Sequence, residues 1–495
     1  MDNIIELNAL NLSSVPENVK IPTYDRSKVK TGIVHVGIGG FHRAHQAYYT
    51  DELLQSHGAD DWGICGIALL ETDKKIYDVL ARQDGLYTLM ITEQDGRKHA
   101  RVIGSIVEYL FAPLNPAAVI KKMADPGVRI ITLTITEGGY NFHPDSGEFM
   151  ADTAGIQWDL YNPEQPKTIF GYLTQALKLR KENGTGVLTL QSCDNIQHNG
   201  AVLKKMLMAY IALAEPELSG WVQKHVSFPN SMVDRITPVT AIADIASLSE
   251  NFSIADEWPV VCEPFCQWII ADDFIAGRPA WEKVGAQFVD EVDPYEKMKI
   301  RLVNGGHVSL GFTGYLNGYR FVNETISDDL YYNFVRGFLD KEASPVLDPV
   351  PGIDIEVYKT ILMQRFANPH IQDQLTRIFS ESSAKIPKFI IPTLLEQLEN
   401  GGEIRKCVLM IASWCRYLEL ADTEGYADEV QDEMRSTLIA NAKASLESDE
   451  LAFIKMDNIF GNLVSYTRFT ELYLSVIRGL RSSGIVKMIE TLDKY

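Results

Sequence analysis

Three polar residues in the second half of the chain, Lys299, Asn304 and His307, have types and spacing that suit the oxidation of an alcohol. In a continuous helix, Asn304 and His307 would lie roughly 140° and 80° around the axis from Lys299, so all three can line one broad face. Alcohol oxidation requires a base that removes the hydroxyl proton while hydride leaves carbon, and donors that hold the developing alkoxide. Lysine is such a base where its surroundings lower its pKa. The alternative is a polar surface helix that contains an ordinary histidine.

Two adjacent glycines, Gly305 and Gly306, follow Asn304 within this predicted helix. Each glycine destabilises a helix by roughly 1 kcal/mol relative to alanine. That cost makes sense if another backbone or a flat ring must come close. We therefore expect a thin, closely packed helix.

A glycine-rich turn early in the chain has residues that could bind the pyrophosphate of a dinucleotide: Gly37, Ile38, Gly39, Gly40 and Phe41. It lies between a predicted strand over 32–36 and a predicted helix over 43–56, which is where Rossmann-type folds hold phosphates. Gly37 permits the tight turn, and Gly39 lets phosphates approach the backbone. His42 replaces the third glycine of the usual fingerprint. A glycine-rich turn without a ligand is therefore the alternative.

An acidic residue after the second predicted strand, over 62–70, strengthens the dinucleotide interpretation. Asp73 lies where an acid accepts hydrogen bonds from the adenosine ribose. An acid there also repels a 2′-phosphate, which favours NAD over NADP. Lys74 and Lys75 follow directly and could bind such a phosphate. The sequence therefore leaves the strictness of NAD selection open.

The elements that position these residues are of two kinds. In the first part of the chain, helical patterns such as the one over 201–213 alternate with β-branched runs. Further runs of this kind span 128–136, 186–193 and 258–262. This alternation predicts an α/β fold with a largely parallel sheet.

The pattern becomes helical near Pro294, and apolar residues then recur at three-to-four spacing. The clearest helical segments span 356–367, 404–420 and 468–480. We expect two domains: a Rossmann-type dinucleotide-binding domain over 1–285 and a mostly helical catalytic domain over 286–495. A chain of 495 residues exceeds what one hydrophobic core usually serves.

Composition and charge limit the classes of function. Hydrophobic residues make up 46% and charged residues 23%, as in soluble globular proteins. A formal charge of −20 argues against nucleic acid or anionic membrane as a partner. Six sparse cysteines, no apolar run of about 18 residues and no signal-peptide pattern lead us to expect a cytoplasmic protein with reduced thiols. We expect no metal, because Cys262 and Cys266 lack a matching pair of zinc ligands.

Ordered motifs along nearly the whole chain resemble those of a known family, the polyol-specific long-chain dehydrogenases and reductases. The motifs span 37–45, 134–140, 192–195 with 199–200, 228–238 and 258–265, with the Lys-x4-Asn-x2-His pattern at 299–307. Each motif alone is weak, but together and in this order they are specific. The unusual glycine turn then fits the family's own variant.

The resemblance implies a Rossmann-type domain, a helical domain and zinc-independent catalysis with NAD in the cleft between them. The implied reaction interconverts D-mannitol and D-fructose by hydride transfer at C2. A hexuronate reductase acting on fructuronate or tagaturonate, or an arabinitol or sorbitol dehydrogenase, remains an alternative within the family. A catalytically silent dinucleotide-binding sensor is the alternative outside it. The partner would be a small polyol or ketose, and the protein a monomer or small homo-oligomer.

The resemblance also implies catalytic roles for four residues. Lys299 would be the general acid and base, and Asn195 and Asn304 would hold the alkoxide. His307 would orient the substrate. Asn195 also follows the predicted strand over 187–193, and ligands collect at the carboxyl ends of parallel strands.

Further residues would complete the site. Asp234, Arg377 and Lys385 match positions that bind substrate, although each could be an ordinary surface charge. Glu296 would relay the proton from the lysine to water, or simply pair with it at i,i+3 spacing. Asp73 matches the acid that selects NAD. Arg377 is also the one residue that we can name for binding a uronate carboxylate.

Overall fold

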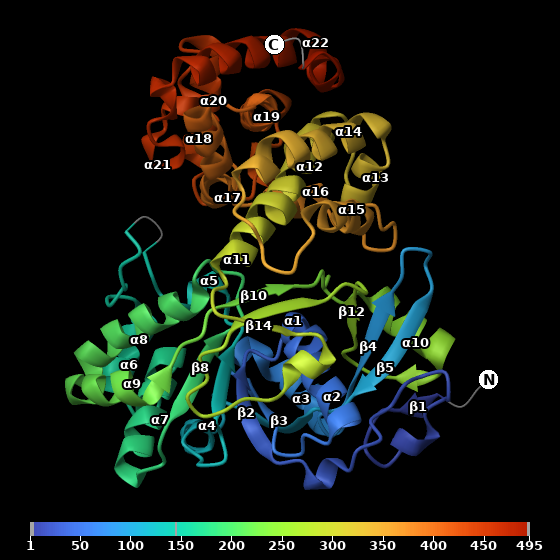
Figure 1. Cartoon of the computed structure of the whole chain (residues 1–495), viewed down its shortest axis with the longest axis vertical. Coiled ribbons are helices and arrows are strands. Elements are labelled where there is room, and N and C mark those ends of the chain that lie inside the picture. The colour runs from blue at the N-terminus through green and yellow to red at the C-terminus, as the bar shows by residue number, and fades with distance from the viewer. Residues whose placement is uncertain (1–3, 144–145, 493–495) are drawn as a thin grey trace. The chain divides into compact units, whose positions relative to one another are not determined.

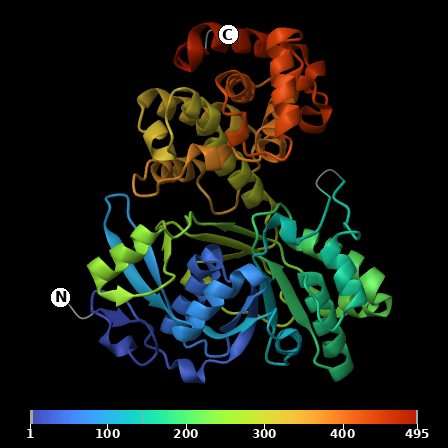
Figure 2. The same ribbon diagram turned by 180° about the vertical axis from the view of Figure 1, so that it is seen from behind.

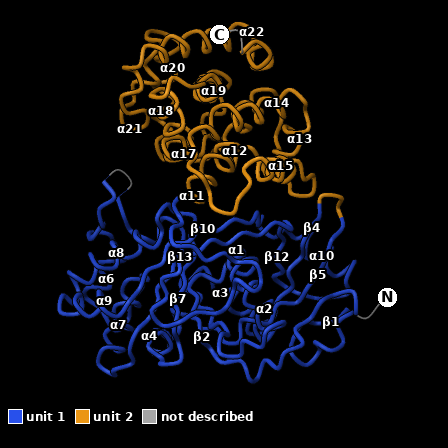
Figure 3. Tube along the Cα trace, viewed as in Figure 1, with its two compact units in different colours: residues 1–93, 97–293 blue, residues 94–96, 294–495 orange. Residues whose placement is uncertain are grey.

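The computed structural model describes residues 4–143 and 146–492 and divides the chain into two compact units (Figure 3). Unit 1 comprises Met1–Glu93 and Arg97–Asp293, and unit 2 comprises Gln94–Gly96 and Pro294–Tyr495. The expected boundary between residues 285 and 286 lies before this division. A cut there would separate β14 (Gln287–Val289) from β13 (Gln267–Ala271), with which it pairs in unit 1.

A six-stranded sheet forms the centre of unit 1, with the order β6-β3-β2-β7-β8-β9 (Figure 1). Its strands are β6 (Ile106–Phe111), β3 (Gly63–Ala68), β2 (Thr31–Val36), β7 (Ile130–Leu133), β8 (Leu188–Ser192) and β9 (Val226–Ser227). All five neighbouring pairs are parallel. The predicted α/β fold with a parallel sheet is confirmed.

Helices cover both faces of this sheet, as the two opposite views show (Figure 2). They include α2 (Gln46–His57), α4 (Pro116–Met123), α7 (Ile169–Asn183) and α8 (Asn199–Ala214). Side chains alternate along each strand, so Ile33 packs in the core with α2 whereas Val34 packs in the core with α7. Burial on both faces explains why the strands are apolar runs instead of alternating ones.

Two sequence expectations in unit 1 are wrong in detail. The run over 258–262 does not join the main sheet: β12 (Val260–Cys262) pairs with β4 (Tyr87–Thr92), which pairs with β5 (Lys98–Ile103). The helix expected over 43–56 is instead α1 (Gly40–Ala44) followed by α2, because the backbone at His45 leaves the helical region.

Two smaller sheets complete unit 1. In one, β10 (Ser231–Asp234) pairs antiparallel with β13, which pairs parallel with β14. In the other, β1 (Ile5–Glu6) pairs with β11 (Ile254–Ala255). The strand β10 ends at Asp234, which the resemblance predicts to bind substrate.

Unit 2 is mostly helical, as predicted. Helix α12 (Gly305–Leu316) packs against α16 (Leu375–Phe379) and α19 (Arg405–Glu424), and α19 packs against α20 (Arg435–Glu447) and α22 (Thr467–Thr491). The predicted segments over 356–367, 404–420 and 468–480 fall within or at the ends of α15 (Ile355–Phe366), α19 and α22. Within the described residues, no helix combines the length and apolar character needed to cross a membrane.

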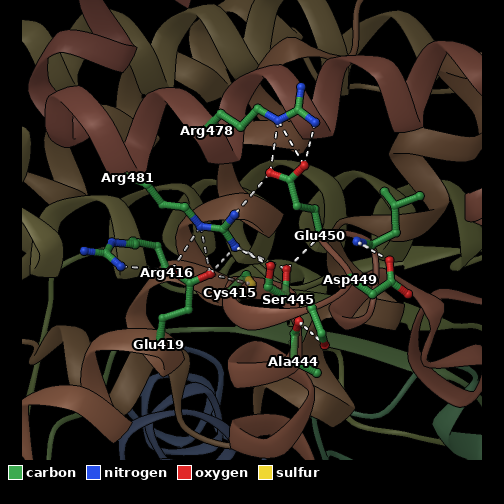
Figure 4. A network of polar contacts seen from close by, with 11 residues as sticks. Cys415, Arg416, Glu419, Ala444, Ser445, Asp449, Glu450, Arg478 and Arg481 are labelled. Atoms are coloured by element: carbon green, nitrogen blue, oxygen red, sulfur yellow. Dashed lines mark hydrogen bonds and ion pairs between the residues drawn. The ribbon is translucent and has the colours of Figure 1, made fainter.

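A network of charged residues joins α19, α20 and α22 (Figure 4). The carboxylate of Glu419 is fully buried and accepts from Arg481 Nη2 at 2.6 Å and from Arg416 Nη1 at 2.9 Å. Arg481 also donates to the carbonyl of Ser445 at 3.0 Å. A buried carboxylate is tolerated only when it is paired in this way. The network therefore fixes the three helices relative to one another.

Candidate active site

The glycine-rich turn begins where β2 ends. Gly37 has φ +94°, and a Cβ built there would lie 2.1 Å from the carbonyl oxygen of Thr134. Any side chain would displace this turn from β7. At Gly39 nothing lies within 4 Å of an added Cβ, so the space above the start of α1 is open. This arrangement can admit a phosphate group beside the backbone.

The position of the missing third glycine is occupied by the buried ring of His42. It stacks on His35 of β2 with ring centroids 3.4 Å apart and planes 11° apart. The third glycine of the usual fingerprint allows a helix to pack closely on a strand. Here two flat rings in contact replace that close approach.

Asp73 lies just after β3, in a short helical turn over Glu71–Asp73. Its Oδ2 accepts from the backbone N–H of Leu70 at 2.9 Å, which fixes the carboxylate at the end of the strand. The two lysines that follow have local partners. Lys74 pairs with Asp78 at 2.7 Å, and Lys75 lies over the ring of Trp258 at 4.1 Å.

Asn195 is exposed in the loop that follows β8. The preceding residue, Asp194, is buried and fixes this loop to the one after β7. Its carboxylate accepts from the backbone N–H groups of Ile135 at 3.0 Å and Thr136 at 2.8 Å, and from the hydroxyl of Tyr140 at 2.7 Å. Burial raises the pKa of Asp194, whereas these hydrogen bonds oppose the rise.

A second set of hydrogen bonds joins the Asn195 loop to β10. The side chain of Asn199 donates to the carbonyls of Asp194 at 3.0 Å and Ser231 at 2.8 Å, and accepts from the backbone N–H of Ser231 at 2.9 Å. Since β10 runs from Ser231 to Asp234, the loop with Asn195 and the strand with Asp234 form one rigid assembly. Asp234 is buried at the strand end.

Lys299 and Glu296 lie one turn apart on α11 (Asp293–Lys299), and both are buried in the described structure. The helix continues beyond Lys299 as expected, but it is not α-helical throughout. A π-helical turn over Ile300–Asn304 separates α11 from α12. The angles of 140° and 80° assumed α-helical geometry throughout and no longer apply. π-turns of this kind occur frequently at functional sites.

The π-turn is anchored on α18 (Ile391–Asn400). Arg301, in the turn itself, donates to Thr393 Oγ1 at 2.9 Å and pairs with Glu396 at 2.6 Å. On α11, the hydroxyl of Tyr295 donates to the carbonyl of Pro351 at 2.7 Å. These bonds lie on both sides of Lys299 and hold its backbone in place.

His307 lies in the first turn of α12 and packs against Phe366 of α15, with ring centroids 4.2 Å apart. The same ring explains one of the two adjacent glycines. A Cβ added at Gly306 would lie 3.1 Å from Phe366 Cε2. A flat ring therefore approaches the helix closely, as the sequence predicted.

Arg377 and Lys385 lie together in unit 2. The guanidinium of Arg377 is paired with Asp373 through two nitrogens, with Nε 2.5 Å from Oδ1. Lys385, on α17 (Ser382–Phe389), donates to the carbonyls of Arg377 and Ile378, each at 3.1 Å, and to Ser380 Oγ at 3.2 Å. Burial, and secondarily Arg377, lowers the pKa of Lys385 to about 8.

Comparison with known proteins places the chain in a family. The mannitol dehydrogenase Rossmann domain model matches residues 31–283, and the mannitol dehydrogenase C-terminal domain model matches residues 291–474. The chain belongs to the mannitol dehydrogenase family. This confirms the resemblance drawn from the motifs.

Individual members of the mannitol dehydrogenase family match the chain from end to end. Mannitol 2-dehydrogenases of Aspergillus fumigatus and Emericella nidulans are 43% and 42% identical, each over 99% of both chains. The solved structure of Pseudomonas fluorescens mannitol 2-dehydrogenase, a ternary complex with NAD and D-mannitol, is 44% identical with a TM-score of 0.88. It covers 99% of this chain and 100% of its own. A substrate-free D-sorbitol dehydrogenase is 36% identical with a TM-score of 0.89, over 98% and 100%.

The positioning residues of this family member were not assigned from the sequence. Asp194, Tyr140, Asn199 and Ser231 lie in the motifs that marked the family, but no role was given to them. The available signal was a polar residue directly beside the predicted alkoxide donor Asn195. No comparable signal marked the π-turn, because the same residues are compatible with a regular α-helix.

Proposed function

We propose that this protein is an NAD-dependent polyol dehydrogenase that interconverts D-mannitol and D-fructose without a metal ion. One observation carries the proposal: the chain matches a mannitol 2-dehydrogenase, solved with NAD and D-mannitol, at 44% identity over 99% of its length. The residue types of the candidate site suit this chemistry.

The described residues of unit 1 fit NAD. Gly37 makes the turn, Gly39 leaves open space, and Asp73 is held at the strand end where it can accept ribose hydroxyls. Lys74 and Lys75 have partners in Asp78 and Trp258, which supports NAD over NADP. When bound, NAD would accept the hydride from C2 of the polyol.

The predicted catalytic residues would do the remaining work. Lys299 Nζ would take the proton from the C2 hydroxyl, and the side-chain amides of Asn195 and Asn304 would donate to the oxygen as it gains negative charge. His307 would donate to or accept from a neighbouring hydroxyl. Glu296, one turn before Lys299, would pass the proton on to water. In ketose reduction the protonated lysine would return it.

Arg377 favours a neutral polyol over a uronate. A uronate carboxylate is best recognised by both arms of an arginine. Both arms of Arg377 bind Asp373 in this structure. A uronate would have to break that pair, whereas a hydroxyl of mannitol could bind beside it. Asp234 and Lys385 would contact further hydroxyls.

Sorbitol is the second candidate substrate, because a D-sorbitol dehydrogenase matches this fold with a TM-score of 0.89. Mannitol and sorbitol differ only in configuration at C2, and oxidation there gives fructose from either. The same residues could therefore serve both reactions.

The deciding experiment follows NADH absorbance with the purified protein. Oxidation is assayed with NAD and mannitol, sorbitol or arabinitol, and reduction with NADH and fructose or fructuronate. We expect the highest kcat/KM for mannitol and fructose, unchanged by a metal chelator. Higher activity on sorbitol or fructuronate would reassign the substrate, and no activity on any of them would overturn the proposal. A cytoplasmic location and a monomeric or small oligomeric state stay proposals, which fractionation and light scattering test.

A further inference from the structure

A row of buried polar residues crosses the middle of the parallel sheet, beneath the glycine-rich turn. His35 of β2 is in register with Thr132 of β7, and Thr132 is in register with Gln191 of β8. Neighbours in register point to the same face of a sheet. All three are completely buried. Burying polar groups at such positions costs free energy unless they form hydrogen bonds. The hydrogen-bond partners of this row therefore indicate its role.

His35 connects this row to the turn. Its Nε2 lies 3.1 Å from the carbonyl oxygen of Gly37 and 2.9 Å from Thr134 Oγ1. The hydroxyl of Thr134 also donates to the same Gly37 oxygen at 2.7 Å. The carbonyl of Gly37 is thus held by two side chains, one in β2 and one directly after β7.

The other ring nitrogen of His35 is fixed from the far side. Nδ1 lies 2.7 Å from Thr132 Oγ1, which in turn contacts the side-chain amide of Gln46 at 2.8 Å. The amide nitrogen of Gln46 has no partner among the described residues. Reversing that amide lets Gln46 donate to Thr132, Thr132 donate to Nδ1, and Nε2–H donate to Gly37.

The ring of His35 is kept neutral and oriented. Burial lowers its pKa to about 3. His42 stacks flat on it, and burial likewise holds the pKa of His42 well below its usual value. A neutral imidazole with Nε2 protonated is a fixed donor, which is what the Gly37 carbonyl needs.

We propose that His35 is a positioning residue for the cofactor: together with Thr134 it holds the Gly37 carbonyl and thereby keeps the glycine-rich turn in the shape that receives the dinucleotide. This inference rests on the proposed function, because it assumes that the turn binds NAD. His35 is fully buried and would act through the Gly37 carbonyl.

Two substitutions of His35 separate positioning from packing. A glutamine amide reaches the place of Nε2, whereas an asparagine amide reaches the place of Nδ1. We expect H35N to weaken NADH binding about tenfold and H35Q to stay within about threefold of the wild type, because only glutamine can still donate to Gly37. The KM for mannitol and kcat at saturating NAD should change little in both. Binding is measured by calorimetry or NADH fluorescence.

A second pair keeps the test decisive if a His35 variant does not fold. T134V removes the hydroxyl at nearly constant volume, and T134S keeps it. We expect T134V to weaken NADH binding several-fold and T134S to bind like the wild type. Equal affinities within both pairs would overturn the inference while leaving the proposed function intact. A wild-type protein that bound no NADH at all would overturn both.

Discussion

The hydroxyl of Tyr140 donates to Oδ2 of Asp194 at 2.7 Å, and this buried bond joins the loop after β7 to the loop that carries Asn195. Tyr140 also contacts Ser192 Oγ at 2.5 Å. Asn195, the proposed alkoxide donor, thus directly follows a residue that is fixed by hydrogen bonds between the two loops. The position of Asn195 therefore depends on hydrogen bonds at the carboxyl ends of β7 and β8 as well as on its own loop.

Removal of that hydroxyl should therefore reduce activity without unfolding the protein. We expect Y140F to lower kcat/KM for mannitol about tenfold and to destabilise folding by about 1–3 kcal/mol, because a buried carboxylate loses one donor. Y172F is the matched control, since the hydroxyl of Tyr172 is also buried but donates to a neutral acceptor, the carbonyl of Ala112, at 3.3 Å. Equal losses of activity in the two variants would contradict the positioning role.

Lys299 should set the pH dependence of both directions. Polyol oxidation is expected to rise with pH as the lysine loses its proton, and ketose reduction is expected to fall. K299M should reduce kcat by at least about 10²-fold, the lower range for a lost general base. K297M is the control, because Lys297 lies on the same helix but pairs with Asp348 and Glu396. pH slopes of the same sign in both directions would rule out one lysine acting as acid and base.

A methyl group at Gly306 should disturb His307 through Phe366. The added Cβ would lie 3.1 Å from the Phe366 ring, which itself packs against His307. We expect G306A to raise the KM for mannitol several-fold and leave the NAD dissociation constant unchanged. At Gly220 on α9 (Ser219–His225) an added Cβ meets nothing within 4 Å, so G220A should stabilise the protein by up to about 1 kcal/mol with normal kinetics. An unchanged KM for mannitol in G306A would contradict a role of His307 in substrate binding.

Lys385 should make substrate affinity sensitive to pH near 8. Its pKa is lowered to about 8 by burial and by Arg377, while Glu381, Asp373 and Asp432 oppose the shift. Above that pH the neutral amine has two N–H groups for three acceptors, so the segment that carries Arg377 loosens. We expect the KM for mannitol to rise above pH 8, and this rise to disappear in K385M. A KM that stays constant from pH 7 to about 9.5 in the wild type would contradict the proposed role.

The network of Figure 4 should dominate the stability of the last three long helices. R481M leaves the buried Glu419 with Arg416 as its remaining cation, and we expect a loss of about 2–4 kcal/mol in the free energy of unfolding. R478M, also on α22, removes an exposed pair with Glu450 and should cost at most about 1 kcal/mol. Denaturant unfolding measures both. Equal losses would show that burial of Glu419 is not the cause.

The sequence predicted the fold well where burial is uniform. The strands around Val34, Ile131 and Leu190 are apolar on both faces, and that pattern has few alternatives in an α/β domain. The strand near Val260 belongs to a different sheet from the one predicted, because a short apolar run does not indicate which strand it pairs with. An exact domain boundary is hard to predict for the same reason, because β14 has only three residues and its pairing with β13 depends on the fold.

For the candidate site, the sequence indicated the candidate residues but not the groups that hold them in place. The spacing of Lys299, Asn304 and His307, together with the family resemblance, made them candidates, as did the place of Asp73 after a strand. Their roles stay predictions. The bonds that hold Arg377 to Asp373 or Asn199 to Ser231 depend on side-chain directions that no periodicity encodes. The role of Asp194 in joining two loops could not be predicted, because an acid after a strand is equally typical of a helix N-cap.

The π-turn at Ile300–Asn304 has a consequence for how this enzyme can change over evolutionary time. Deleting one residue from the turn would restore a regular α-helix, with better hydrogen bonds and a more stable backbone. It would also shorten the spacing between Lys299 and Asn304 by one residue while leaving the following helix nearly in place, because a π-turn holds about one residue more than the α-helical turn that would replace it. Stability and activity therefore select for different lengths of this segment. Insertions and deletions should be far rarer here than in the surface loops, even though the regular helix is the more stable one.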